Sequence, residues 1–219
     1  MKVLNRIVFT LLIFTIPFTA VFIAANVTFR LPDVYKFELS RTEVLGELEV
    51  NESEDRVAEF ISSYMLDKED SFQMQAEYKD KIRNIFSPGE GEFMATSKSY
   101  LDISFIALCL MLVFIIFAYW FLRKQKRKTA IRFAYKGGWI VYIIFGLAAT
   151  VTLALDRVRN WMMGFAFKYE FTDSDLLPQF FGRPFALESV AAIVIISLII
   201  LLAGMSITWR LTKPERIFW

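Results

Sequence analysis

Four long apolar runs, separated by polar stretches, form the dominant pattern of this chain. The runs are Ile7–Ala25, Ile103–Leu122, Trp139–Leu155 and Leu187–Trp209. A helix of about 20 apolar residues is long enough to cross a bilayer, so each run predicts one transmembrane helix. The predicted fold class is therefore an all-α membrane protein with four transmembrane helices and a small helical cap outside the membrane.

Two features of the apolar runs need separate interpretation. The length of the first run favours a retained membrane anchor, and a cleaved signal peptide ending at Ala24-Ala25 is the alternative. Pro17 inside this run is expected to kink its helix, which neighbouring helices in a bundle can accommodate. Gly146 and Gly204, in the third and fourth runs, are expected where helices pack closely.

Basic residues predict how the chain is oriented in the membrane. The segment Arg123–Lys128 directly follows the second run, and further Lys and Arg precede the first run and follow the fourth. Short loops rich in Lys and Arg stay in the cytoplasm, so both termini are predicted to be cytoplasmic and the two larger polar segments extracytoplasmic. Binding of the basic loop to anionic lipid or nucleic acid is the weaker interpretation, and no nucleic-acid partner is expected.

This topology divides the chain into eight segments. The cytoplasmic segments are short, and the two extracytoplasmic segments hold the candidate chemistry. In order, the segments are the N-terminus with the first transmembrane helix (1–25), an extracytoplasmic acidic domain (26–100), the second transmembrane helix (101–122), a basic cytoplasmic loop (123–138), the third transmembrane helix (139–155), an extracytoplasmic amphipathic loop (156–186), the fourth transmembrane helix (187–209) and a cytoplasmic tail (210–219).

The acidic domain is predicted to be small and mainly helical. Tyr35–Val50 alternates loosely and is expected to hold a short strand, whereas Asn51–Leu66 predicts a helix capped by Asn51 with Glu54. Phe72–Phe86 predicts a weaker second helix. From residue 30 to residue 100 the chain has 16 acidic and 9 basic residues, which most simply form a solvated surface; a binding surface is the alternative.

The second transmembrane helix is predicted to begin well before its apolar run. Ser87 can cap the helix, Pro88 suits the first helical position, and Glu90 is placed to reach back to the Ser87 N–H in a capping box. The cap and the positive end of the helix dipole are expected to lower the pKa of Glu90. The helix start from Ser87 to Lys98 would then lie at the rim of the lipid.

The loop Trp161–Phe185 mixes aromatic and charged residues, which suits the lipid headgroup boundary. One interpretation is a half-embedded connection that closes the helix bundle, and the other is a lipid- or substrate-binding segment. In the second case we expect a cleft between this loop and the helix start at Ser87–Lys98.

Composition narrows the possible chemistry. The chain has no histidine, which removes the commonest general base near neutral pH and the commonest metal ligand. Its one cysteine, Cys109, excludes an intramolecular disulfide and a cysteine-cluster metal site. No metal and no cofactor are therefore expected.

The order of motifs resembles the bacterial four-helix membrane proteins that include the lipoprotein intramolecular transacylases. That family has a signature near the start of its second transmembrane helix and a Phe-His pair in its second outer loop. The signature matches at Phe86, Glu90, Met94 and Lys98, while Phe93 stands at the family's histidine. Phe167-Lys168 occupies the Phe-His pair, and Asp175-Leu176-Leu177 and Pro184-Phe185 match later positions.

The resemblance implies a lipid- or lipoprotein-handling protein of the bacterial cytoplasmic membrane. The family's reaction moves an acyl group from a glyceryl-cysteine to the α-amine of that cysteine, which needs a base and a stabilised oxyanion. Phe93 cannot transfer protons, so acyltransferase-like activity would depend on Glu90 and Lys168. Lys168 could be the base only if desolvation lowered its pKa, and Glu90 could be the base only if its pKa were raised. The expected substrate- or lipid-binding residues are Glu92, Phe93, Lys98, Tyr169 and Arg183.

Two other function classes remain open. Because both family histidines are replaced, the chain is also interpreted as a pseudoenzyme, a non-enzymatic accessory subunit that binds a partner membrane protein. A transporter or channel ranks last, because few charges lie within the apolar runs and transport pathways usually carry them.

Overall fold

The computed structural model of this protein describes residues 2–47, 49–78, 81–155 and 175–213. Within those residues, four helices are long and apolar enough to cross a membrane. They are α1 (Lys2–Thr28), α5 (Pro88–Lys124), α6 (Lys128–Ala154) and α9 (Arg183–Leu211). These helices coincide with the four apolar runs, so the predicted fold class of a four-helix membrane protein is confirmed.

The chain forms two compact units, which are described separately. The helical unit comprises Met1–Ala24, Ser104–Val151 and Ile193–Trp219. The polar unit comprises Ala25–Ile103 and Thr152–Ala192. Helix α5 has 37 residues, which at 1.5 Å per residue is about 55 Å and exceeds the roughly 30 Å of bilayer hydrocarbon. We therefore take Ile103–Leu122 as its membrane-spanning part.

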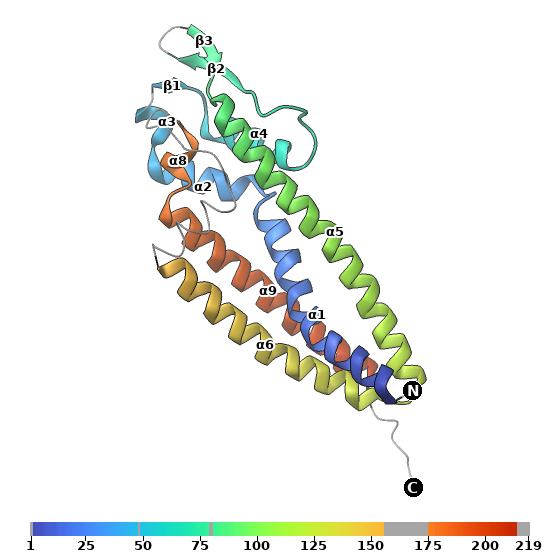
Figure 1. Ribbon diagram of the computed structural model, residues 1–219. Coiled ribbons are helices and arrows are strands. Elements are labelled where there is room, and N and C mark those ends of the chain that lie inside the picture. The colour runs from blue at the N-terminus through green and yellow to red at the C-terminus, as the bar shows by residue number, and fades with distance from the viewer. Residues whose placement is uncertain (1, 48, 79–80, 156–174, 214–219) are drawn as a thin grey trace. The chain divides into compact units, whose positions relative to one another are not determined.

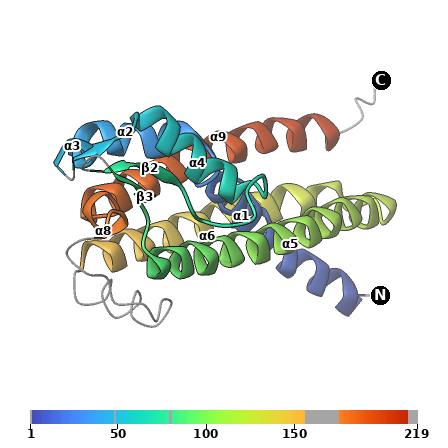
Figure 2. The same cartoon turned by 90° about the horizontal axis from the view of Figure 1, so that it is seen from above.

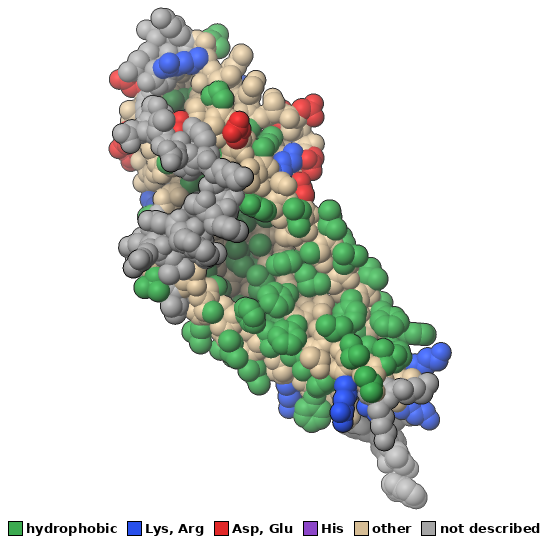
Figure 3. Space-filling view, in the orientation of Figure 1, with side chains coloured by type: hydrophobic (Ala, Val, Ile, Leu, Met, Phe, Trp, Pro, Cys, Tyr) green, Lys and Arg blue, Asp and Glu red, His purple; other side chains and the backbone are tan. Residues whose placement is uncertain are grey.

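The helical unit packs parts of all four long helices around one apolar core (Figures 1 and 2). Its outward side chains are also apolar, including Ile116 and Ile140, which are 69% and 62% exposed. Figure 3 shows hydrophobic side chains spread over these helices, with Lys and Arg gathered at one end of them. An apolar outer surface is what a lipid environment requires. The core is formed mainly by Leu12, Ile16, Leu122, Ile131 and Leu201.

Tyrosine hydroxyls tie α9 to its neighbours inside the helical unit. The Tyr135 hydroxyl donates to the Leu201 carbonyl at 2.7 Å, and Tyr119 Oη lies 2.7 Å from the Thr208 hydroxyl. Gly204 makes the expected close contact, because a Cβ there would lie 2.4 Å from the Tyr135 hydroxyl oxygen. A Cβ on Gly146 would have no described atom within 4 Å, so the same expectation is wrong at Gly146.

The polar unit begins with helices where a strand was expected. Helices α2 (Pro32–Thr42) and α3 (Val44–Glu47) occupy most of Tyr35–Val50, and β1 is only Val50–Asn51. Tyr35, Glu38 and Leu39 are buried at helical spacing, and Pro32 fixes the first turn of α2. The predicted strand was wrong because this helical period outweighed a loose alternation.

The next predicted helix is present as α4 (Glu54–Met65). Its cap is Ser53, whose side-chain oxygen accepts a hydrogen bond from the Arg56 N–H at 3.3 Å. The predicted cap by Asn51 was wrong, because Asn51 lies in β1 and its side-chain amide donates to Glu77 at 3.2 Å.

A small sheet replaces the second helix predicted over Phe72–Phe86. Strands β2 (Gln75–Tyr78) and β3 (Lys81–Asn84) pair antiparallel, and the strand order is β1-β2-β3. The side chains of Phe72, Met74 and Ala76 are buried while those between them are exposed, which is the period of a strand. The helix prediction was wrong because it relied on more widely spaced apolar residues.

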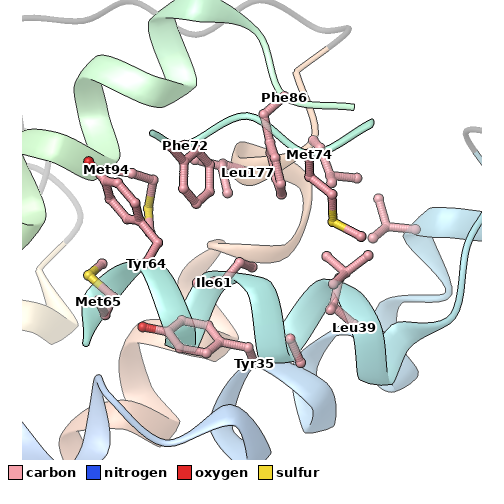
Figure 4. Close-up of a cluster of buried hydrophobic side chains, with 14 of the residues drawn as sticks. Tyr35, Leu39, Ile61, Tyr64, Met65, Phe72, Met74, Phe86, Met94 and Leu177 are labelled. Atoms are coloured by element: carbon pink, nitrogen blue, oxygen red, sulfur yellow. The ribbon is translucent and has the colours of Figure 1, made fainter. Parts of the chain in front are cut away.

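One aromatic-rich core holds the polar unit together (Figure 4). Tyr35 is fully buried, and its hydroxyl donates to the Phe29 carbonyl at 2.6 Å. Ile61 of α4 and Leu177 of α8 (Leu177–Phe180) have no exposed surface. Residues distant in sequence thus share this core, and they include the described end of the Trp161–Phe185 loop.

Candidate functional site

The capping box at the start of α5 forms as predicted and extends further. Glu90 Oε2 accepts the Ser87 N–H at 2.6 Å, and the Ser87 hydroxyl accepts the Glu90 N–H at 3.2 Å. Glu90 Oε1 accepts the backbone N–H of Leu177 at 2.6 Å. One carboxylate therefore caps its own helix and binds the first residue of α8, which lies 87 positions later in the chain.

Burial decides the protonation behaviour of Glu90. The residue is fully buried, and this desolvation raises the pKa of its carboxyl. The two backbone hydrogen bonds lower that pKa, as expected, and the nearby Asp175 carboxylate raises it. The net direction is upward, so the sequence-based expectation of a lowered pKa was wrong. The pKa of the Glu90 carboxyl is therefore closer to neutral pH than the pKa of an ordinary glutamate.

A cavity of about 740 Å³ lies beside this cap, within the polar unit. Glu90, Glu92 and Asp175 contribute three acidic residues to its wall and Arg83 contributes one basic residue, and Asp175 is itself buried. Phe72 and Phe86 contribute apolar wall. A cavity lined by more acidic than basic residues, with an apolar side, suits a ligand that joins a cation to a hydrocarbon group.

Two predicted binding residues of α5 lie away from this cavity wall. Phe93 is buried, and its ring centroid lies 6.3 Å from that of Phe181. The ammonium of Lys98 pairs with Asp67 at 2.6 Å and lies 4.5 Å from the Tyr64 ring centroid. The hydrogen bond from Lys98 lowers the pKa of Asp67. The structure thus brings Glu90 and Glu92 together and places Phe93 and Lys98 in other contacts.

The remaining predicted site residues are not placed by the structure. Lys168 and Tyr169 lie outside the described residues, and Arg183 is described only as the first residue of α9. Their catalytic and binding roles stay predictions. Within the described parts of the chain, no three or more Asp, Glu, Cys or His side chains are grouped as metal ligands would be.

A second buried carboxylate was missed by the sequence analysis. Glu38 of α2 is almost fully buried, and it shares the guanidinium of Arg41 with Glu188 of α9. Its Oε2 has no hydrogen-bond partner among the described residues. Desolvation raises the pKa of Glu38, the Arg41 guanidinium lowers it, and the Glu188 carboxylate raises it. The i, i+3 spacing of Glu38 and Arg41 could be read from the sequence, but the contact of Arg41 with Glu188 could not.

We expect Glu38 to make stability depend on pH. Its folded-state pKa lies above the ordinary value of 4.5, so its contribution to stability is complete below that value and is lost as pH rises through the folded-state pKa. The Glu38→Gln variant keeps the shape and removes the titration, so its unfolding temperature should fall less than that of wild type from about pH 4 to 8.

The matched control for this prediction is Glu47→Gln, because Glu47 is an exposed acid of the same unit. Thermal unfolding of the three proteins should give parallel curves for wild type and Glu47→Gln. A constant offset between wild type and Glu38→Gln across the whole pH range would contradict the assigned titration.

Fold and site together define a class: a four-span membrane protein with a small polar unit that carries an acidic cavity. Its fold is that of the membrane integral lipoprotein intramolecular transacylase Lit from Bacillus cereus. One structure of that protein, a variant with a histidine replaced by alanine, matches with a TM-score of 0.70 at 15% identity over 97% of this chain and 93% of the other.

Two further Lit structures agree with the first. A variant with histidine replaced by arginine gives a TM-score of 0.69 at 15% identity, over 97% of this chain and 92% of that one. Another structure gives 0.68 at 14% identity, over 97% and 96%. At such identities the likeness establishes the fold. No protein-family model and no curated protein sequence matches the chain.

Proposed function

We propose that this membrane protein handles lipoproteins by binding their acylated N-terminus at the acidic cavity beside Glu90. The observation that carries the proposal is that three acidic residues, Glu90, Glu92 and Asp175, line one cavity that has an apolar wall and one basic residue, Arg83. The N-terminus of a diacylglyceryl-peptide joins an ammonium group to acyl chains, so it offers a partner to both parts of the wall. The fold shared with a lipoprotein transacylase supports the same substrate class.

Binding is the main role that we propose for this protein. Acyl transfer to an amine requires removal of a proton, and this chain has no histidine for that step. Both oxygens of Glu90 already accept backbone N–H groups, which favours a positioning role for this carboxylate. Two of the Lit structures carry a replaced histidine, so that histidine is not needed for the fold. A binding protein can therefore keep this architecture.

Binding can be measured with a fluorescent diacylglyceryl-cysteinyl peptide that has a free α-amine and purified protein in nanodiscs. Asp175→Asn should weaken binding about ten-fold, because an ammonium loses a charge-assisted contact in a partly desolvated site. Asp70→Asn is the matched control, since Asp70 is exposed and does not line the cavity. Equal affinities for all three proteins would contradict the proposed site.

Turnover is the second readout with the same peptide. Migration of the acyl group to the amine produces an N-acyl isomer, which tandem mass spectrometry distinguishes from the O-acyl form. We expect wild type and Lys168→Ala to leave the peptide unchanged, because the proposed role is binding without acyl transfer. Conversion by wild type that is lost in Lys168→Ala would instead establish an acyltransferase with Lys168 as its base.

We also propose an orientation of the chain in the membrane. We place the polar unit outside the cytoplasmic membrane of a bacterium and both termini inside, because Lys and Arg precede the first apolar run, follow the second and follow the fourth. An accessory role would also involve a partner membrane protein. Stoichiometric recovery of one such protein after gentle detergent extraction is the result expected for that role.

A further inference from the structure

Among the residues that the structure describes, no strand pairs with β3 on its side away from β2, and we call this side the open edge. The strand order β1-β2-β3 places β3 at the end of the sheet (Figure 1). The Ile85 N–H donates to the Met74 carbonyl at 2.9 Å, so this pair is hydrogen-bonded across the hairpin. Hydrogen-bonded pairs alternate along an antiparallel ladder. The N–H and C=O groups of Ile82 and Asn84 therefore point away from β2, toward the open edge.

The other side of the sheet agrees with this assignment. Glu77 is opposite Ile82 in the β2–β3 register, so its main-chain groups point away from β3. Glu77 is also the β2 residue that pairs with Asn51 of β1. The same alternation thus explains why β1 pairs with β2 at Glu77 and why the main-chain groups of Ile82 and Asn84 point away from β2.

The open edge leads directly to the acidic cavity. Arg83 and Asn84 at the end of β3 line the cavity, as does Ser87 three residues later. Glu90 follows one helical turn after Ser87. A chain whose N-terminal amine lies at the cavity carboxylates can therefore continue past Ser87 and Asn84 toward Ile82.

We infer that the β3 edge binds, as an added antiparallel strand, the peptide that follows the acylated residue of the lipoprotein. This inference rests on the proposed function and names the peptide part of its substrate. The direction follows from the cavity, because the substrate amine lies at the Glu90 end of β3. Main-chain hydrogen bonds to Ile82 and Asn84 bind a peptide without reading its sequence, which suits a site that serves many lipoproteins.

The first test compares three ligands with the wild-type protein in nanodiscs. They are a diacylglyceryl-cysteine amide without peptide, the same group with a six-residue peptide, and that peptide with alternate backbone amides N-methylated. We expect the unmodified peptide to bind about ten-fold more tightly than either of the others, the equivalent of two hydrogen bonds. Equal affinities for all three would overturn the inference while leaving the amine site intact.

The second test changes the edge of the protein. Ile82→Pro removes one outward N–H and leaves the β2–β3 hydrogen bonds in place, because proline is tolerated at such edge positions. It should weaken peptide binding about five-fold and leave the affinity for the peptide-free ligand unchanged. Ile82→Thr, which keeps the N–H and removes the apolar side chain, should bind like wild type.

Three other outcomes would also overturn the edge assignment. One is equal weakening by Ile82→Pro and Ile82→Thr, which would assign the effect to the side chain. Another is dimerisation of wild type that Ile82→Pro abolishes, because the edge would then pair with a second copy of this chain. If none of the three ligands binds, the proposed function fails first, and the edge assignment fails with it.

Discussion

Replacing Glu90 by alanine is expected to lower the free energy of unfolding by about 3–5 kcal/mol. The carboxylate accepts the N–H groups of Ser87 and Leu177, and its removal leaves both without that partner in a buried place. Hydrogen bonds to a charged group contribute about 1.5–3 kcal/mol each, which sets this magnitude. Thermal unfolding of the purified protein in detergent measures the loss.

Glu92→Ala is the matched control for this experiment. Glu92 has the same side chain, lies two positions later in the same helix turn and is exposed. Its replacement should change the free energy of unfolding by less than about 0.5 kcal/mol. Similar losses in both variants would show that the α5 cap does not depend on the bridge from Glu90 to Leu177.

The second large effect is expected in the helical unit at Gly204. A Cβ there would lie 2.4 Å from the Tyr135 hydroxyl oxygen, which is held by its hydrogen bond to Leu201. Gly204→Ala must therefore displace a buried tyrosine and break that bond. Overpacking and the lost hydrogen bond together should cost about 2–4 kcal/mol.

Gly146→Ala provides the comparison, because a Cβ at Gly146 meets no described atom within 4 Å. Alanine is also the better helix former, so this variant should unfold at the wild-type temperature or slightly above it. Restoring space with Gly204→Ala combined with Tyr135→Phe should recover part of the stability. Loss of stability in Gly146→Ala equal to that in Gly204→Ala would contradict the assigned contact.

The membrane helices were predictable because their signal is local. Each apolar run is long enough to cross a bilayer by itself, and no distant residue is needed to recognise it. The capping box at Ser87 and Glu90 was predictable for the same reason, since all of its groups lie within four residues. Local chemistry was sufficient for these features.

The polar unit was predicted less well because its elements are short. The hairpin in Phe72–Phe86 has strands of only four residues. Three apolar residues at alternate positions gave a weak strand pattern, and a chance helical spacing of other apolar residues outweighed it. The pKa of Glu90 is raised because the folded chain buries its carboxyl, and the pKa of Glu38 is raised by burial and by the Glu188 carboxylate. Tertiary contacts of this kind set the pKa direction and are not visible in a local pattern.

The resemblance found in the sequence and the likeness of the folded chain point to the same protein class. The resemblance was based on a few positions, including Phe86, Glu90 and Met94, which the structure places in one region of the polar unit. The likeness to Lit covers nearly the whole chain. In this protein the acidic cavity among the described residues occurs in a chain without histidine.

The most direct test of this account is the affinity of the wild-type protein for two diacylglyceryl-cysteinyl peptides that differ only at the α-amine. One carries a free ammonium, and the other is N-acetylated and uncharged at that position. We expect the free amine to bind at least about ten-fold more tightly, because only a cation benefits from the carboxylates around the cavity. Equal or tighter binding of the acetylated peptide would contradict it.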